Sequence, residues 1–566
     1  MSDPFSSPPA ATGPFKINSA SGGFETSVGQ PVIPVGVNYW PASCGVEMWS
    51  HWPAEEIQAD LDLVRSLGLN CVRFFLRWQD FEPVAGRYDE RAFAHLDDLL
   101  CWHHERNLLA HPALFVGYMS GGIFWPEWFD GRNVFSDPAL RERAAAFAEK
   151  ASAICARHPG TILAIDQGNE LSVLPECAAA RPAEVAAWCA VVSTAIRRGF
   201  PAALVVSGSE QTQVNMDVGW RFGAQAGCNF YSMHTYPVST WHSLAFDGMT
   251  DPLAQSLLPF YLKCARAWGP VMAQEFGTLL TRGQTECDTY LRAVLPACRQ
   301  AGANGFLWWC LRDISFPGHP YDKYAFEGQL GLVDARDRVK PSLQFFLEFA
   351  RGLLAHPVAP ASPTSSVAIY WPREYYLRDN PRNPGNEPGV LSRQLAICHF
   401  ALSEAGVEPR IVRYVRELAA TDTLVIAGAK LTVTEISELD NWVRAGGRLI
   451  WHGPDALTWG SGLETLLGAE ALDFRAPNPR EFRWLDHQWR FTLFPRDIFL
   501  KIRLTSARSL ASDATGDPVL FRHAAGQGCV VTCVAEVDRE FALTSNRREG
   551  REQWTRWYRG MLAAVQ

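Results

Sequence analysis

The alternation of short apolar runs with longer amphipathic segments constrains the fold of this chain more than any other feature, and it extends from residue 31 to about residue 350. The short runs have the composition of strands, and the segments between them repeat their apolar residues with a helical period. Eight strands, each followed by a helix, predict a (β/α)8 barrel. The expected strands are residues 33–39, 70–76, 108–116, 161–167, 203–208, 228–233, 270–275 and 304–309.

A doubly wound α/β sheet is the alternative to a barrel for this pattern. Such a sheet usually carries a glycine-rich phosphate-binding turn after its first strand, and the stretch GVNYWPASCG is not one. The barrel is therefore the better interpretation of this part of the chain.

The length of 566 residues exceeds what one hydrophobic core supports and suggests two or three domains. The barrel is predicted to span residues 31–352, and a Pro/Ser/Ala-rich linker follows at 353–365. Residues 366–475 again alternate strands with helices, which predicts a small flavodoxin-like layer. Residues 476–566 are β-rich and should complete this second domain. Residues 1–30 are rich in Ser, Pro and Gly and are predicted to be disordered.

Charge and cysteine usage narrow the possible partners. The net charge of −8 comes without a basic block, which argues against nucleic acid and anionic membranes. No apolar run reaches the ~18 residues of a membrane span, and residues 1–30 contain no secretory signal, so we expect a cytoplasmic protein. The 14 cysteines are scattered and form no CxxC pair, which predicts free thiols in a reducing compartment. We expect neither a cofactor nor a metal.

The carboxyl ends of barrel strands carry the chemistry, so the residues there are informative. A lone glutamate such as Glu170, which ends TILAIDQGNE, would ordinarily cap the next helix or lie in solvent. Glu275 ends the seventh strand, however, and strands four and seven face each other across the mouth. Two carboxylates about 5–5.5 Å apart are what a retaining glycosidase needs. The other candidate site residues are Asn38, Trp40, Arg73, Trp125, Asn169, His234, Tyr236, Trp308 and Trp309.

This pattern resembles clan A of the glycoside hydrolases, whose barrels carry an Asn-Glu acid/base on strand four and a glutamate nucleophile on strand seven. The stretch VRFFLRWQDFEPVAGRYD (72–89), followed by Leu96-Asp97, resembles a segment of families 5, 35 and 42 of that clan. GLVDARDRVKPS (331–342) resembles the stretch after the last strand of such enzymes. Two features depart from family 5. Leu171 stands where many members have proline, and LFVGYMSGG lacks the histidine that several members place after strand three.

The resemblance implies a role for each member of the catalytic pair. Glu275 would be the nucleophile, kept ionised by Arg73 and hydrogen-bonded by Tyr236. Glu170 would be the acid/base, and Asn169 would hold the sugar 2-hydroxyl.

The remaining candidates have a structural alternative beside the implied role. His234 would fix Glu170 or a sugar hydroxyl, or it is a core histidine, and Arg73 is alternatively an interior ion pair. Trp308 or Trp309 would form the floor on which the sugar stacks, and because adjacent strand residues alternate faces, one of the two must point away. Trp40, Trp125 and Trp128 fit subsite walls or packing, and Asp166 and Asp313 are expected to be structural.

The second domain, residues 366–540, resembles the glutamine-amidotransferase-like domain that follows the barrel in family 42 β-galactosidases and mediates their trimerisation. A working amidotransferase needs a nucleophilic cysteine on a strand-to-helix turn, and the strands ending in VIAG and IWHG have none. The resemblance therefore implies a non-catalytic domain for assembly or for shaping the site, and a homo-oligomer, either a trimer or a dimer.

Taken together, the predicted function is that of a retaining exo-β-glycosidase that hydrolyses short β-linked oligosaccharides by double displacement. A β-mannosidase is favoured, and a β-galactosidase or β-glucosidase comes next. Two alternatives stay open: an endo-acting β-1,4-mannanase or glucanase, and a catalytically inactive carbohydrate-binding protein.

Overall fold

The computed structural model describes residues 13–278, 283–360, 365–376, 387–454, 462–473, 480–491, 501–545 and 550–566. The chain divides into two compact units. Unit 1 comprises Met1–Gln213, Val218–Pro237 and Asp247–Ser362, and unit 2 comprises Val214–Asp217, Val238–Phe246 and Pro363–Gln566. The predicted fold class, a (β/α)8 barrel followed by a flavodoxin-like α/β domain with additional strands, is confirmed.

Unit 1 is a barrel of parallel strands. Their order is β10-β9-β6-β5-β4-β13-β12-β11, and a parallel bridge between Glu210 and His234 connects the two ends of this sheet. The strands are β4 (Val35–Tyr39), β5 (Cys71–Phe75), β6 (Leu109–Ala113), β9 (Ile165–Asn169), β10 (Val205–Gly208), β11 (Tyr231–Thr235), β12 (Val271–Phe276) and β13 (Ala303–Trp308).

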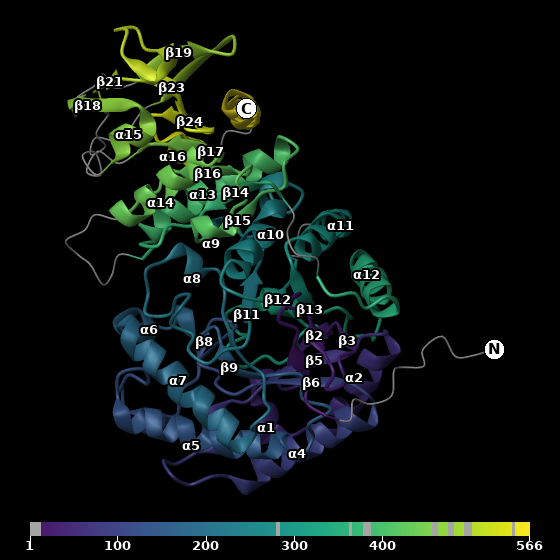
Figure 1. The fold of residues 1–566 in the computed structure, drawn as a ribbon. Helices are drawn as coiled ribbons and strands as arrows, with labels where there is room; N and C mark the ends of the chain where they lie inside the picture. The colour runs from purple at the N-terminus through teal and green to yellow at the C-terminus, as the bar shows by residue number, and fades with distance from the viewer. Residues whose placement is uncertain are drawn as a thin grey trace. The chain divides into compact units, whose positions relative to one another are not determined.

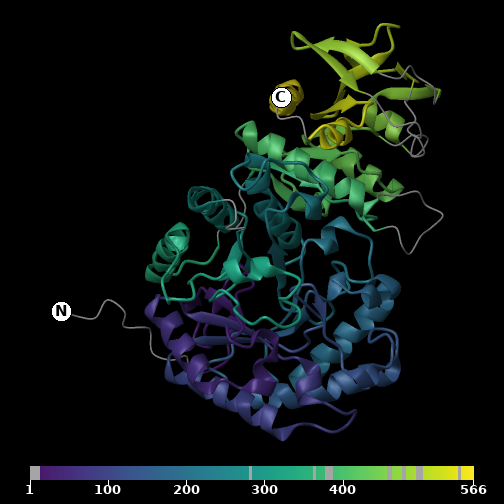
Figure 2. The ribbon, with the colours of Figure 1, turned by 180° about the vertical axis from the view of Figure 1, so that it is seen from behind.

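Helices surround these strands (Figures 1 and 2). Some of them begin at an aspartate that caps the helix: the Asp137 carboxylate accepts hydrogen bonds from the backbone N–H groups of Ala139 and Leu140, and Pro138 occupies the first turn. All residues between β10 and β11 are described, and the only helix there is the four-residue α8 (Thr212–Asn215). The long helices of unit 1 are α2 (Ala54–Ser66), α4 (Glu90–Glu105), α5 (Pro138–Cys155), α7 (Pro182–Gly199), α10 (Pro252–Arg266), α11 (Gln284–Gln300) and α12 (Gln344–Ala355).

The fourth barrel strand begins later than its apolar run suggests. Residues 161–167 were the expected strand, whereas β9 covers Ile165–Asn169. Leu163 and Ala164 belong instead to a buried cluster, in which Cys71, Leu204 and Phe230 lie at or just before the start of another barrel strand. β9 ends at Asn169, and Glu170 follows it in a left-handed conformation with φ 50°.

Residues 1–30 are predicted to be disordered, and the structure corrects this from residue 13 onward. Lys16–Ile17 (β1), Phe24–Glu25 (β2) and Pro31–Val32 (β3) form a small antiparallel sheet. Phe15 and Phe24 join the buried cluster at the N-terminal end of the barrel and are 4% and 2% exposed. Composition suggested disorder because Ser, Pro and Gly dominate the segment, but Phe15 and Phe24 bury their rings, and that burial favours an ordered chain.

Unit 2 is built on a sheet with the order β15-β14-β16-β17-β24-β23-β22. Its first five strands are parallel, and in chain order they run 2-1-3-4-5, which is the flavodoxin-like arrangement. The fifth of them, β24, comes from the β-rich C-terminal region, so that region and the preceding α/β layer share one sheet. The strands are β14 (Val367–Tyr370), β15 (Arg410–Val412), β16 (Thr423–Ala427), β17 (Arg448–His452), β22 (Arg508–Ser512), β23 (Pro518–Ala525) and β24 (Gly528–Cys533).

The remaining elements of unit 2 pack on or beside this sheet. Two small antiparallel pairs, β18–β21 and β19–β20, lie outside it. The helices are α13 (Pro388–Glu404), α14 (Val433–Arg444), α15 (Leu463–Leu467), α16 (Val537–Leu543) and α17 (Arg551–Val565), and the paired strands are β18 (Ala469–Asp473), β19 (Arg480–Trp484), β20 (His487–Phe491) and β21 (Lys501–Leu504).

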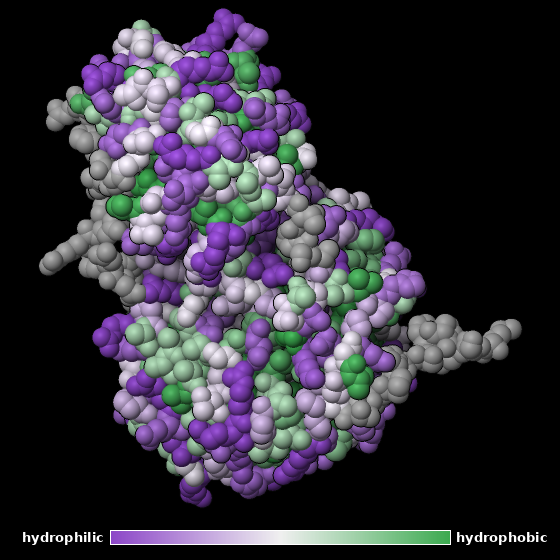
Figure 3. All heavy atoms as spheres, viewed as in Figure 1, coloured by the Kyte–Doolittle hydropathy of each residue, from purple (hydrophilic) through white to green (hydrophobic). Residues whose placement is uncertain are grey.

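On the face shown in Figure 3, hydrophilic and hydrophobic residues are interspersed. Among the residues that the structure describes, no helix combines the length and the apolar character needed to cross a bilayer.

Candidate active site

Arg73 is the centre of the polar network inside the barrel mouth. It lies on β5, is fully buried, and forms an ion pair with Asp166, whose Oδ2 is 2.8 Å from Nη2 and 3.1 Å from Nε. Its Nη1 also lies 3.4 Å from Glu275 Oε2. The sequence analysis gave two alternatives for Arg73, an interior ion pair or a partner of Glu275. In the structure Arg73 forms both contacts. A buried guanidinium tolerates this position because carboxylates compensate its loss of hydration.

Two amides are held by the same guanidinium. Nη1 of Arg73 donates to Asn38 Oδ1 and Nη2 donates to Asn169 Oδ1, both at 3.0 Å. Asn38 also donates to the backbone oxygen of Gln274 at 3.1 Å, and Asn169 donates to that of Tyr118 at 2.9 Å. Asn38 therefore braces the barrel interior, while Asn169 sits next to Glu170.

Glu170 and Glu275 approach each other across the mouth as their strand positions predict. One oxygen of each carboxyl group and one nitrogen of His234 all lie within 4.8 Å of one another. His234 Nδ1 is 3.0 Å from Glu170 Oε1 and 3.6 Å from Glu275 Oε2. Three such ligand atoms could contact a cation, but a carboxyl pair at this separation is also the arrangement of a retaining glycosidase, which needs no ion.

The surroundings of the two carboxyl groups differ, although burial raises the pKa of both. Glu275 accepts a hydrogen bond from the Tyr236 hydroxyl at 2.9 Å, and Arg73, His234 and Tyr236 all lower its pKa against the effect of burial. Burial raises the pKa of Glu170 to about 7, and only Arg73 opposes that rise. Burial raises the pKa of Glu275 to about 7 as well. The difference lies in the partners: three contacts favour the ionised form of Glu275, whereas Arg73 alone favours that of Glu170.

Similarity to known proteins shows the family to which this barrel belongs. No family model and no curated protein matches the chain. Among solved structures, the exo-beta-1,4-mannosidase Op5Man5 from Opitutaceae bacterium strain TAV5 is 46% identical, with a TM-score of 0.92 over 96% of this chain and 99% of that one. The chain belongs to the clan A glycoside hydrolases.

More distant structures share the fold of this glycoside hydrolase. A GH5_18 protein from Streptomyces cattleya in complex with Manb1-4GlcNAc is 22% identical, with a TM-score of 0.59 over 68% of this chain and 94% of that one. The beta-galactosidase from Rahnella sp. R3 is 15% identical, with a TM-score of 0.69 over 92% of this chain and 88% of that one. The predicted clan and the predicted barrel are confirmed.

The two adjacent tryptophans at the end of β13 point to opposite faces in this glycoside hydrolase. Trp308 packs against Phe276 and Phe346, with ring centroids 5.6 and 5.9 Å away, and donates to the Leu330 backbone oxygen. It thus belongs to the layer between strands and helices, which corrects its place among the candidate sugar platforms. Trp309 instead donates to Glu327 Oε2 at 2.9 Å.

Trp40 and Trp125 retain unused hydrogen-bond donors. Trp40 stacks on Phe75 and Trp125 stacks on Phe129, with ring centroids 5.3 and 5.2 Å apart. Among the described residues, neither indole N–H has an acceptor. A buried donor without a partner is unusual, and a sugar hydroxyl would satisfy it.

Sequence reasoning missed Gln274, which lies directly before Glu275. Strict alternation would point these neighbours to opposite faces. The pairing of β12 shifts register between Ala273 and Phe276, and this irregularity lets both side chains reach the polar interior. Gln274 contacts His234 and Asp166. Only a bulge near the end of this strand could have indicated that Gln274 reaches the site.

Two further buried carboxyl groups, Glu210 and Glu327, were also missed. Burial raises the pKa of each to about 7, and the negative charge of Glu170 adds to both shifts. Glu210 follows β10, where its Oε1 accepts a hydrogen bond from Ser172 at 2.8 Å. Its place directly after a barrel strand was the signal available in the sequence.

Unit 2 has no amidotransferase nucleophile at the two turns where the sequence analysis looked for one. The turns after β16 and β17 contain Gly428 and Gly453 and no cysteine. Cys398, on α13, is fully buried, and burial raises the pKa of its thiol well above the usual value. Such a thiol carries almost no thiolate and is inert.

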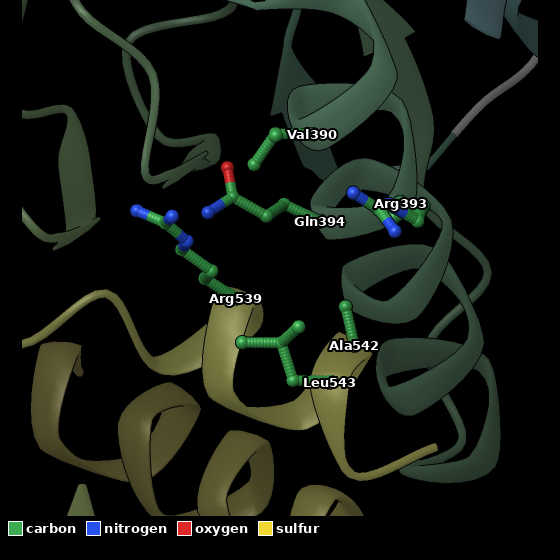
Figure 4. A pocket seen from close by; sticks show the side chains of 6 residues that line it. All are labelled: Val390, Arg393, Gln394, Arg539, Ala542 and Leu543. Atoms are coloured by element: carbon green, nitrogen blue, oxygen red, sulfur yellow. The ribbon is translucent and has the colours of Figure 1, made fainter. Parts of the chain in front are cut away.

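A separate cavity of about 140 Å³ lies between α13 and α16 of unit 2. Figure 4 shows Gln394 and Arg539 projecting into this space. No carboxylate, imidazole or thiol is among the residues that line it, so it lacks the groups of a hydrolytic site. The lining consists of Val390, Arg393, Gln394, Arg539, Ala542 and Leu543.

Proposed function

We propose that this glycoside hydrolase is a retaining exo-β-mannosidase that removes terminal mannosyl units from short β-1,4-linked oligosaccharides. The observation that carries the proposal is the cluster of Glu170, His234 and Glu275, whose polar atoms lie within 4.8 Å of one another at the barrel mouth. The mannoside preference rests on the 46% identity to an enzyme named as an exo-beta-1,4-mannosidase.

In the first step, the Glu275 carboxylate attacks the anomeric carbon and forms a glycosyl–enzyme ester. The electrons of the broken glycosidic bond pass to the leaving oxygen, which takes the proton of Glu170. Tyr236 and Arg73 hold the attacking carboxylate through its two oxygens, at 2.9 and 3.4 Å. Both contacts favour the ionised form that the attack requires.

In the second step, Glu170 acts as a base. It takes a proton from a water molecule, the water oxygen attacks the anomeric carbon, and the bond to Glu275 breaks. Two inversions at the same carbon retain the β configuration. Asn169 would hold the sugar 2-hydroxyl, and Trp309, Trp40 and Trp125 would line the site.

Unit 2 is proposed to serve assembly and not catalysis. Its flavodoxin-like sheet carries a buried thiol and no cysteine at the expected turns, which supports a non-catalytic, amidotransferase-like role. We propose a homo-oligomer, a dimer or trimer, assembled through this unit. A cytoplasmic location is also proposed, because all fourteen cysteines are free thiols, as a reducing compartment would keep them.

The test uses p-nitrophenyl β-mannoside, β-galactoside and β-glucoside with the full chain. We expect the β-mannoside to be turned over fastest, with the β-anomer as the first product seen by NMR. Glu170→Gln and Glu275→Gln should each lower kcat/KM for mannobiose by about 10³-fold, because each removes a group that acts in the transition state. Glu90→Gln, at an exposed surface ion pair, is the matched control and should leave the rate unchanged.

Other outcomes separate the alternatives. Hydrolysis of polymeric mannan without turnover of any aryl monosaccharide would identify an endo-acting enzyme. Binding of mannooligosaccharides without turnover would identify a carbohydrate-binding protein. Faster turnover of the β-galactoside would change the sugar and leave the retaining mechanism in place.

A further inference from the structure

A chain of buried hydrogen bonds runs from the barrel backbone to the carboxyl group of Glu170, and the mechanism above does not use most of it. His111 on β6 and Gln274 on β12 are both fully buried and belong to this chain. His111 Nδ1 lies 2.8 Å from the backbone oxygen of Ala164. A carbonyl oxygen only accepts, so this nitrogen carries the His111 proton and Nε2 is left with a lone pair.

The orientation of the Gln274 amide follows from its two neighbours. Its nitrogen lies 2.7 Å from His111 Nε2 and 3.0 Å from Asp166 Oδ2. Both neighbours are acceptors, and the amide nitrogen has two hydrogens to give them. A flipped amide would bring its oxygen against a carboxylate and a lone pair at once. The Gln274 oxygen is therefore the atom that faces His234.

The same reasoning determines the state of His234. Its Nε2 lies 2.9 Å from Gln274 Oε1 and must donate to it. In the neutral ring the other nitrogen, Nδ1, is then an acceptor, and it lies 3.0 Å from Glu170 Oε1. An oxygen and a nitrogen at that distance need one proton between them, and with Nδ1 bare that proton is on Glu170.

We propose that Gln274 is a positioning residue that keeps the ring proton of His234 on Nε2, so that the bare Nδ1 holds the acid proton on Glu170. The proposal rests on the proposed function of Glu170 as acid/base. The arrangement serves both steps. In the first, the proton stored on Glu170 leaves its hydrogen bond to His234 Nδ1 and passes to the leaving oxygen as the glycosidic bond breaks. Once it has left, the new Glu170 carboxylate faces a lone pair, which makes it a stronger base toward water.

Burial supports this distribution of the proton. It lowers the pKa of His234 and raises that of Glu170, so the neutral pair is favoured over an imidazolium–carboxylate pair. Other charged and titratable groups act on the pair from the surrounding elements, and none of them gives His234 Nε2 a second acceptor. They are Arg73, His111, Tyr118, Asp166, Glu210, Tyr236, Glu275 and Glu327.

The test replaces Gln274 by methionine, which has similar length and no hydrogen-bonding amide. In Gln274→Met the His234 proton is free to move to Nδ1, where it donates to the Glu170 carboxylate and favours its ionised form. We expect the alkaline limb of kcat/KM for phenyl β-mannoside to move down by about one pH unit. Turnover of 2,4-dinitrophenyl β-mannoside, whose leaving group needs no proton, should be retained.

Gln167→Met is the matched control. Gln167 is also a fully buried barrel glutamine, but its amide binds the Cys189 backbone oxygen and the Ser193 hydroxyl at 2.9 and 2.8 Å. Its loss should reduce stability without moving the pH profile. The proposal is overturned if both variants keep the wild-type alkaline limb, or if both shift it equally.

Neutron diffraction from deuterium-exchanged wild-type crystals near neutral pH locates the ring proton of His234 directly. This measurement needs no variant to fold and no enzymatic activity. We expect a deuteron on His234 Nε2 and none on Nδ1, and a deuteron on Nδ1 overturns the proposal. If the wild-type chain cleaves no β-glycoside, the proposed function fails, and the diffraction result still decides the state of His234.

Discussion

At the scale of single residues, the site makes two identical side chains behave differently. Glu170 and Glu275 are both buried and lie at the ends of facing strands, yet only Glu275 has a guanidinium and a hydroxyl as hydrogen-bond partners. Glu170 faces an imidazole nitrogen instead. An acid and a nucleophile thus arise from one residue type because the partners, and not the glutamates, differ.

The raised pKa of Glu170 predicts the pH dependence of the reaction. The acid works only while protonated, so kcat/KM for phenyl β-mannoside should fall as pH rises through about 7. The nucleophile works only when ionised, so the rate should also fall as pH drops through the pKa of Glu275. A pH–rate profile checks both limbs. An alkaline limb that persists in Glu170→Gln, assayed with 2,4-dinitrophenyl β-mannoside, would assign it to another group.

The two tryptophans of β13 should separate binding from stability. Trp308→Phe is expected to leave KM unchanged and to lower the free energy of unfolding by about 1–3 kcal/mol, because its ring packs between strands and helices. Trp309→Phe removes the hydrogen bond to Glu327 and should raise KM for mannobiose several-fold. Steady-state kinetics and urea unfolding of both variants measure the contrast. Equal KM values in the two variants would contradict the assignment of faces.

At the scale of elements, local irregularities decide which side chains meet. The register shift in β12 brings Gln274 and Glu275 into the same interior. β9 starts later than its apolar run and ends at Asn169, and Glu170 follows immediately at φ 50°. Neither feature follows from a two-residue period, because bulges and strand starts depend on what the neighbouring strands and the barrel floor allow.

The small N-terminal sheet should contribute to barrel stability. Phe24→Ala is expected to lower the free energy of unfolding by about 3–5 kcal/mol, since its ring is buried among residues at the strand starts. Val28→Ala, in the same segment but 74% exposed, is the control and should change it by less than about 0.5 kcal/mol. Urea unfolding followed by tryptophan fluorescence measures both. A Phe24→Ala variant as stable as wild type would contradict this role and support the disorder that composition suggested.

At the scale of the whole molecule, two α/β units with different chemistry share one chain. Unit 1 places Glu170, His234 and Glu275 at or near the carboxyl ends of its barrel strands. Unit 2 has five parallel strands in the 2-1-3-4-5 order, completed by β24 from the far end of the sequence. Two of its buried polar groups, His452 and Asp538, pair at 2.7 Å, as is common in a structural core.

The amino-acid sequence by itself determined the barrel and the two catalytic candidates. Strand and helix periods are local features that a single sequence shows. Because the parallel strands of a barrel end at the same edge, Glu170 and Glu275 could be placed opposite each other from the sequence. The flavodoxin-like layer followed from the same periodicity.

Only the tertiary structure decided how the supporting residues are used. Arg73 combines both of its predicted alternatives, and Trp309 rather than Trp308 turns toward the polar interior. The places of Gln274 and the N-terminal sheet were not foreseen at all. Each depends on contacts between residues far apart in the chain, and hydrogen-bond partners, register shifts and burial of that kind leave no periodic trace in a single sequence.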